Sequence, residues 1–235
     1  MRLCCVLILP LILCPLPSAF AAAPSSVKIS YDVYKGSLRI GQIEETYTRD
    51  KDSYTLKSTT RAVGLLAIFK PGRIVINSRG LIGTQGLQPL SFSDQREGES
   101  DRNRQAELDW TANKLTLISP SQRRVLELPA GTQDRLSAMY QFMFLSPQSG
   151  ITLDFPMTNG NKLDNYHYVI TRGESLKTPA GKFDTLYLDN QPKKGESRTE
   201  IWLATQQYNL PCKMTITEVD GGQLTQILNK LEIKP

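Results

Sequence analysis

The chain has 235 residues, of which 40% are hydrophobic, and its 28 Lys and Arg against 23 Asp and Glu give a formal net charge of +5. This composition is sufficient for a folded core. The chain has four cysteines and one histidine, and three of the cysteines (Cys4, Cys5 and Cys14) lie close to its start. Too few ligands remain for a Cys/His zinc cluster, an iron–sulfur site or a scaffold of several disulfides.

Residues 1–21 have the pattern of a cleavable secretory signal peptide. One arginine precedes an almost continuously apolar run over residues 3–16, and Ala19 and Ala21 are the small residues that the signal peptidase requires. An uncleaved anchor is disfavoured because the run is short and contains two prolines. A lipoprotein signal ending at Cys14 is disfavoured because the preceding residue is a leucine. We expect cleavage after Ala21, or one or two residues later, and delivery to the periplasm.

Removal of this segment changes the net charge and the number of cysteines of the chain. The net charge falls from +5 to +4 because one arginine is lost, and Cys212 is then the single cysteine. We expect Cys212 to be buried, since it begins an apolar stretch. No other segment is apolar over enough residues to span a membrane. The basic residues are scattered in runs of at most two, which argues against a nucleic-acid partner. We expect a monomer.

The rest of the chain, residues 22–235, consists mainly of short runs in which apolar and polar residues alternate between Gly, Pro, Asn and Asp clusters. Alternation with a period of two is typical of strands with one buried face. We therefore predict about a dozen strands, over residues 27–34, 38–48, 54–62, 73–78, 90–96, 104–110, 115–119, 123–128, 153–158, 164–172, 183–189, 197–204, 212–219 and 224–233.

One segment has a different period. Over residues 132–145 the spacing of an amphipathic helix is followed by the apolar residues Leu136, Met139, Tyr140, Met143 and Phe144. Thr132 is a candidate N-cap, and Pro147 ends the segment. We predict one long α-helix here, wrapped by a strongly curved antiparallel sheet, an open or half barrel. The fold class is a single, mainly β domain.

Candidate catalytic groups are few. His167, the single imidazole, lies in an alternating strand, and no Gly-x-Ser-x-Gly motif supplies a nucleophilic serine. Asp164 is its nearest acidic neighbour in sequence, but it points to the opposite face of a regular strand. The segment 94–104 interleaves acidic and basic residues, which is typical of a solvated hairpin tip rather than of paired catalytic carboxylates. We expect no enzyme, no cofactor and no metal site.

An apolar segment, residues 63–69, connects two predicted strands where a polar turn is usual. Such a connector either closes one end of the barrel or serves as a gate or membrane-touching loop for an apolar ligand. The apolar face of the predicted helix likewise forms either core or the lining of an adaptable pocket. The candidate ligand-binding residues, as pocket or lid, are Leu65, Leu66, Phe69, Leu136, Met139, Tyr140 and Met143.

Several short motifs occur in a recognisable order. They are Tyr31-Asp32-Val33-Tyr34, Gly86-Leu87-Gln88-Pro89, Asp134-Arg135-Leu136-Ser137, Thr178-Pro179-Ala180-Gly181-Lys182-Phe183-Asp184-Thr185, and Trp202 followed by Leu210-Pro211. This arrangement resembles the DUF3108 family of bacterial secreted proteins of unknown function over nearly all of residues 22–235. The resemblance implies a curved half barrel around a helix, similar in architecture to the lipoprotein carriers LolA and LolB, and implies no catalytic residues. Gly86 and Pro89 fit one turn, and Pro179 and Gly181 another.

Two functions are consistent with these observations. The first is a non-catalytic periplasmic protein that binds a hydrophobic or amphiphilic ligand, such as a lipid, or a cell-envelope component, in the concave sheet. The alternative is a structural or protein–protein interaction module of the envelope, which would use strand edges or the hairpin near residues 94–104. A cavity between the helix and the sheet is the feature that discriminates them, because only the first function requires one.

Overall fold

The structure is a computed structural model that describes residues 23–64, 67–68 and 72–235. The predicted signal peptide and the candidate lid residues Leu65, Leu66 and Phe69 lie outside the described residues, so these predictions stay untested. Within the described part of the chain, seventeen strands are present, and fifteen form one large sheet in the order β8-β7-β6-β5-β4-β3-β2-β1-β17-β16-β15-β14-β11-β10-β9.

The bounds of the first strands are β1 (Ser26–Lys35), β2 (Leu38–Asp50), β3 (Ser53–Ala62), β4 (Arg73–Gly83), β5 (Gly86–Arg96), β6 (Arg104–Asp109), β7 (Lys114–Ser119), β8 (Gln122–Glu127) and β9 (Gln133–Asp134). The later strands are β10 (Thr152–Thr158), β11 (Leu163–Arg172), β14 (Thr185–Asp189), β15 (Arg198–Ala204), β16 (Leu210–Thr217) and β17 (Gln223–Lys234). A separate hairpin consists of β12 (Leu176–Thr178) and β13 (Gly181–Phe183). After residue 72, the helical elements are the 3-10 turn η1 (Ser100–Arg102), α2 (Ser137–Gln141) and the 3-10 turn η2 (Phe142–Phe144).

The predicted strands are confirmed in type, and their alternation has the expected cause. In β3 the buried residues Tyr54, Leu56 and Ser58 follow one another at every second position, so one face of the sheet points inward. The prediction lacks three strands, β9, β12 and β13, which have only two or three residues each and therefore no measurable period. The turn predicted at Pro179 is confirmed between β12 and β13. The turn predicted over residues 86–89 is wrong, because these residues begin β5.

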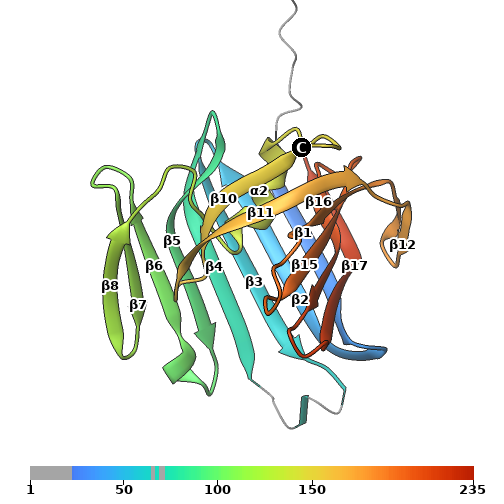
Figure 1. Cartoon of the computed structure of the whole chain (residues 1–235), viewed down its shortest axis with the longest axis horizontal. Coiled ribbons are helices and arrows are strands. Elements are labelled where there is room, and N and C mark those ends of the chain that lie inside the picture. The colour runs from blue at the N-terminus through green and yellow to red at the C-terminus, as the bar shows by residue number, and fades with distance from the viewer. Residues whose placement is uncertain (1–22, 65–66, 69–71) are drawn as a thin grey trace, which may run out of the picture.

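The sheet curls back on itself without closing. In Figure 1 the ribbons of β10 and β11 cross in front of β3 and β4, and α2 lies close to them. The returning edge reaches the inner face of β5, where Gln133 Nε2 donates a 2.8 Å hydrogen bond to Leu87 O. Strands β6, β7 and β8 continue beyond this contact, so the edge strands β8 and β9 do not pair within the described structure. The predicted open barrel is therefore confirmed in its coarse form.

The prediction of one long helix is wrong. The segment that starts at residue 132 begins as the extended strand β9, parallel to the end of β10, and only Ser137–Gln141 is α-helical, followed by the single turn η2. The reason is the carboxylate of Asp134, whose Oδ1 accepts the backbone N–H groups of Leu136 (2.9 Å) and Ser137 (2.8 Å). A side chain that accepts these donors marks the start of a helix. The predicted cap, Thr132, bonds instead to Pro129 O.

The helical segment fills the space between the two halves of the sheet. Leu136, Tyr140 and Met143 pack in the larger buried cluster with side chains such as those of Tyr47 and Leu56 on the first strands. The other side of the segment contributes to a smaller cluster around strands β11, β14 and β15, and Met139 packs against both clusters. No helix in the described residues is long and apolar enough to cross a membrane.

Candidate ligand-binding cleft

The helix residues predicted to line a pocket lie in the core. Tyr140 is 1% exposed, Leu136 5% and Met143 8%, while Met139 is half-buried. The hydroxyl of Tyr140 donates a 3.0 Å hydrogen bond to Glu45 Oε2 on β2, and its ring stacks on Tyr47. None of the four residues lines any of the three cavities described below. These four side chains therefore pack in or against the core, which is one of the two positions considered for this face of the helix.

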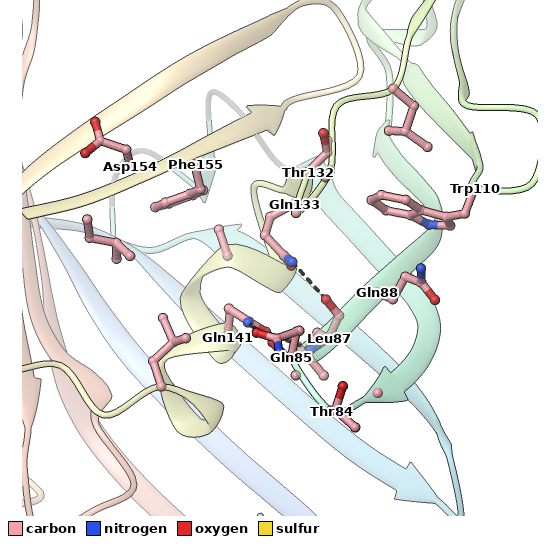
Figure 2. A pocket seen from close by; sticks show the side chains of 18 of the residues that line it. Thr84, Gln85, Leu87, Gln88, Trp110, Thr132, Gln133, Gln141, Asp154 and Phe155 are labelled. Carbon is pink, nitrogen blue, oxygen red and sulfur yellow. Dashed lines mark hydrogen bonds between the residues drawn. The ribbon is translucent and has the colours of Figure 1, made fainter.

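The opposite side of the helical segment lines a cleft of about 750 Å³. Figure 2 shows Trp110 and Phe155 on opposite sides of this cleft, with Gln133 and Gln141 between them. Its apolar lining includes Leu87, Trp110, Leu128, Ala138, Phe142, Leu145, Leu153 and Phe155, and its polar lining includes Thr84, Gln85, Gln88, Thr132, Gln133, Gln141 and Asp154. From the sequence, the strongest apolar face of the helix was interpreted either as core or as the lining of a pocket, whereas the cleft is lined by the more mixed face.

The cleft results from the incomplete closure of the sheet. Residues 153–155 belong to β10, which has returned over the inner face of β5, whereas Trp110 and Leu128 follow β6 and β8, which extend beyond it. The two walls therefore diverge from the line where Gln133 meets Leu87. The indole Nε1 of Trp110 donates a 2.7 Å hydrogen bond to Pro89 O, which fixes the ring at the mouth of the cleft.

Backbone contacts at the start of β5 hold the floor of the cleft. Gln141 Oε1 accepts the N–H of Leu87 at 2.7 Å, and Gln141 Nε2 donates to Gln85 O at 2.7 Å. Between them Gly86 has a φ of +95°, and a Cβ at this position would lie 2.5 Å from Gln141 Oε1 and 2.8 Å from the Cβ of Phe144. This position therefore requires glycine for both its backbone conformation and the close approach of the helix.

A buried polar chain joins the helix start to the sheet. The hydroxyl of Ser78 donates a 2.5 Å hydrogen bond to Asp134 Oδ2, and Tyr54 Oη lies 3.0 Å from Ser78 Oγ. All three side chains are almost completely buried. Burial raises the pKa of Asp134 above its ordinary value, although the hydrogen bonds from Ser78 and from the backbone oppose this shift. This series of buried hydrogen bonds anchors the helical segment, which forms the inner wall of the cleft.

The segment 94–104 is not the fully solvated hairpin tip that its charges predict. Strand β5 continues to Arg96, and Asp94 is only 3% exposed. Its Oδ2 lies 3.3 Å from Nη2 of Arg96 and 3.3 Å from Nη2 of Arg135. In a strand every second side chain lies on the same face, so the buried Phe92 indicates that Asp94 and Arg96 lie on the inner face as well.

The single histidine has an acidic partner that the sequence did not indicate. His167 Nδ1 lies 2.6 Å from Asp154 Oδ1, directly across the β10–β11 pair, and both side chains are at least half exposed. Asp164, the neighbour considered from the sequence, pairs with Lys162 instead. Within the described residues, no group of three or more His, Cys, Asp or Glu side chains is arranged to hold a metal ion.

The prediction that Cys212 is buried is confirmed. Its side chain is completely buried, and its Sγ contacts Trp202 O at 3.4 Å. Burial raises the pKa of the thiol to about 11. A thiol in this state is inert at neutral pH, so Cys212 has a structural role and contributes no nucleophile.

Three solved structures were compared with the chain, and the first of them shares its fold. A protein of the DUF1849 domain family from Brucella abortus, described as β-barrel-like, superposes with a TM-score of 0.53 and 14% identity, covering 89% of this chain and 98% of its own. A predicted lipoprotein from Parabacteroides distasonis matches with a TM-score of 0.38 and 10% identity, over 89% and 95% of the two chains. A predicted exported protein with a YmcC-like fold from Bacteroides fragilis matches with a TM-score of 0.33 and 9% identity, over 89% and 96%.

Comparison at the level of sequence identifies the family. No curated protein matches the chain. The family model described as "Protein of unknown function (DUF3108)" matches residues 30–229, which include β2 to β16 completely and most of β1 and β17. The open sheet, the short helix and the cleft beside it are thus features of a member of the DUF3108 family, to which this chain belongs.

Proposed function

We propose that the protein is a non-catalytic binding protein of the periplasm that holds a hydrophobic or amphiphilic ligand in the cleft beside α2. The observation that carries this proposal is the combination of the volume of the cleft, about 750 Å³, with walls that are mainly apolar. Binding sites for small molecules usually have this size, with apolar walls and a few polar groups. The periplasmic location rests on the signal peptide predicted over residues 1–21.

The polar groups of the cleft favour a ligand with an uncharged polar end. Asp154 is the single charged side chain among the described residues that line it. Gln133 uses its Nε2 in the bond to Leu87 O, whereas its Oε1 is buried without a hydrogen-bond partner in the described structure. A hydroxyl or amide of a ligand would satisfy this acceptor, while its apolar part would lie between Trp110 and Phe155.

The chain provides its own spectroscopic probe for a test. It has two tryptophans, Trp110 at the cleft and Trp202 in the core. In a W202F protein all tryptophan emission comes from Trp110. Titration with monolaurin below its critical micelle concentration should shift or quench this emission, and the change should reach a plateau at high monolaurin concentration. In the matched W110F protein the remaining Trp202 should show no change. An equal response of both proteins, or none in W202F, would refute binding in the cleft.

A pair of substitutions tests which surface binds the ligand. L153E places a charge on the wall of the cleft, and L90E places the same charge on the outside of β5, where Leu90 is 40% exposed. We expect L153E to abolish the monolaurin response and L90E to retain it, since burial of a charge in an apolar wall is costly. Native mass spectrometry of the protein purified from periplasm, followed by lipid extraction, should identify the natural ligand.

The alternative of an interaction module is favoured by one observation. Strand β9 pairs with only Met157 and Thr158 of β10, so the edge of β10 over residues 152–156 has no partner strand in the described structure. An extended peptide can add to such an edge. Because Thr158 O accepts the N–H of Arg135, Thr152 directs its backbone groups to the same edge, and it does not line the cleft. T152P should then abolish capture of a crosslinked partner without changing the response to monolaurin.

A further inference from the structure

We propose that a second, smaller cavity of the protein, about 170 Å³ in volume, binds a phosphate-type oxyanion. The cavity lies where the β10–β11 turn meets β5 and β6, and its lining residues are Asp94, Arg96, Arg102, Arg104, Arg135, Asn159 and Asn161. Four guanidinium groups and a single carboxylate therefore surround one space. Arginine is the side chain best suited to hold phosphate, because its planar donors match the phosphate oxygens.

The positive charges at this cavity are only partly paired within ion-pair distance. Asp94 Oδ2 is shared between Arg96 and Arg135, and the exposed Arg102 pairs with Glu99 at 2.7 Å. Arg104 Nη1 donates only to backbone carbonyls, those of Asp101 (2.9 Å) and Asn103 (2.7 Å), and the side chain has no acidic partner in the described structure. Within ion-pair distance, four arginines thus share two carboxylates, and a bound anion would add the missing negative charge.

The hydrogen bonds at the cavity are also incomplete, and in a way that indicates the type of anion. Of the four buried side-chain atoms without a hydrogen-bond partner among the described residues, two belong to this cluster, Arg96 Nε and Asp94 Oδ1. One is a donor and the other an acceptor. Hydrogen phosphate, and a phosphate monoester in its singly protonated form, supply both an accepting oxygen and a donating P–OH group, whereas sulfate has no proton to donate to Asp94. We therefore expect phosphate to bind in preference to sulfate.

The fold assembles this cavity from four separate segments. Asp94 lies directly opposite Arg104 in the β5–β6 register, and Arg96 lies one step further along the same face of β5. Arg135 comes from the extended segment between β9 and α2, where its backbone N–H donates to Thr158 O at 3.0 Å. Asn159 and Asn161 belong to the turn that follows β10. The return of β10 over the sheet, seen in Figure 1, brings these groups together.

The surroundings of the cavity allow two sources of the phosphate group. Arg96 and Arg102 also line a neighbouring cleft of about 640 Å³, whose apolar lining includes Val33, Ile40, Ala62 and Ile74. The oxyanion is therefore either a free ion or the headgroup of a phosphate monoester whose apolar chain lies in that cleft. Both sources share the same contacts with the arginines. This proposal is independent of ligand binding beside α2, which involves a different set of lining residues.

The test is isothermal titration calorimetry on the chain without residues 1–21, at low ionic strength. Inorganic phosphate should bind with a stoichiometry of one, and sulfate should bind roughly tenfold more weakly for the loss of one hydrogen bond to a charged group. R104Q should weaken phosphate binding roughly tenfold. R123Q is the matched control, because Arg123 is exposed on β8, does not line the cavity, and loses the same charge. R102Q provides a second variant if R104Q fails to fold.

Each outcome has a defined meaning. Tighter binding of dodecyl phosphate than of inorganic phosphate supports the headgroup as the source, and equal binding supports the free ion. Absence of phosphate binding at millimolar concentration would overturn the proposal, as would equal losses in R104Q and R123Q, which indicate nonspecific attraction to positive charge. Sulfate binding as tight as phosphate would overturn the part assigned to Asp94. Thermal unfolding followed by circular dichroism verifies that each variant is folded.

Discussion

The carboxylate of Asp134 is expected to be among the most sensitive groups for the stability of the fold. It is completely buried and accepts three hydrogen bonds, from the Ser78 hydroxyl (2.5 Å) and from the backbone N–H groups of Leu136 (2.9 Å) and Ser137 (2.8 Å). Asp134→Ala would leave three buried donors unsatisfied. Since each such group costs about 1–3 kcal/mol, we expect a loss of about 3–9 kcal/mol in the free energy of unfolding.

Asp134→Asn separates hydrogen bonding from charge. The amide oxygen can still accept both backbone N–H groups, and the amide nitrogen can donate to Ser78 Oγ, so we expect a loss below about 1.5 kcal/mol at neutral pH. The direction of the pH dependence follows from burial, which raises the pKa of Asp134 in the folded state. A raised pKa stabilises the fold at a pH below the unfolded pKa of about 3.9, and this stabilisation is lost as the pH rises through the folded pKa.

The assay is urea unfolding followed by tryptophan fluorescence at pH 4, 6 and 8. Because asparagine does not titrate, the stability of D134N relative to the unsubstituted protein should improve as the pH rises. Asp109 provides the control, since its exposed carboxylate also accepts two backbone N–H groups, those of Thr111 and Ala112. We expect D109A to cost less than about 1 kcal/mol, because water can replace these bonds. A similarly small cost for D134A, or a relative stability of D134N that falls with rising pH, would refute this reasoning.

Three further predictions concern single side chains. Cys212, with its pKa raised to about 11 by burial, should not react with Ellman's reagent at pH 8 until urea unfolds the protein; rapid reaction without urea would contradict its burial. Gly80→Ala should destabilise the protein by about 2 kcal/mol or more in urea unfolding, because the new Cβ would overlap a backbone carbonyl of β5. Gly83→Ala, where the Cβ meets no atom of the described residues within 4 Å, should be nearly neutral, and similar losses of stability for both substitutions would show that the overlap is not the cause. Tyr140→Phe should cost about 1–3 kcal/mol in the same assay, because Glu45 Oε2 loses its donor, and a cost near zero would show that water replaces it.

The long strands were predictable because each has one buried face. The strand predicted over residues 54–62 is observed as Ser53–Ala62, and the one predicted over 164–172 as Leu163–Arg172. The helix was predictable only in part. The apolar spacing after residue 136 is that of a real helix, but Gln133 and Asp134 pair with Met157 and Thr158, and periodicity within a segment carries no information about a partner strand distant in the sequence.

The cleft was not predictable for a related reason. A helix between two layers is covered on both sides, and its strongest apolar face is the one that periodicity detects. Leu136 and Tyr140 belong to that face and are core residues, whereas Gln141 and Leu145 on the other side line the cleft. A face that combines glutamine with apolar residues resembles an ordinary half-exposed surface. This face of the helix lines a cleft only because β10 lies opposite it, and the local sequence does not determine where β10 lies.

The register of the first strands explains why the charged residues face inward at one level of the sheet. Across β2 to β6 the directly opposed inward residues are Glu45, Ser58, Ile76, Asp94 and Arg104. The adjacent row consists of Tyr47, Leu56, Ser78, Phe92 and Ala106. The inner face thus changes from mainly apolar to mainly polar between two neighbouring rows. A helix laid across both rows would bury the charges without partners, which is costly.

The short helix and the basic cavity therefore have the same structural origin. Residues 133–135 are extended, so the backbone N–H of Arg135 donates to Thr158 O while its guanidinium lies 3.3 Å from Asp94. In the long helix predicted from the sequence, residues 133–135 would form the first turn, and the segment could not follow β10 to the polar row. The early end of the helix leaves that row open beside the β10–β11 turn. The difference between the predicted and the observed helix is thus the feature that creates the proposed oxyanion site.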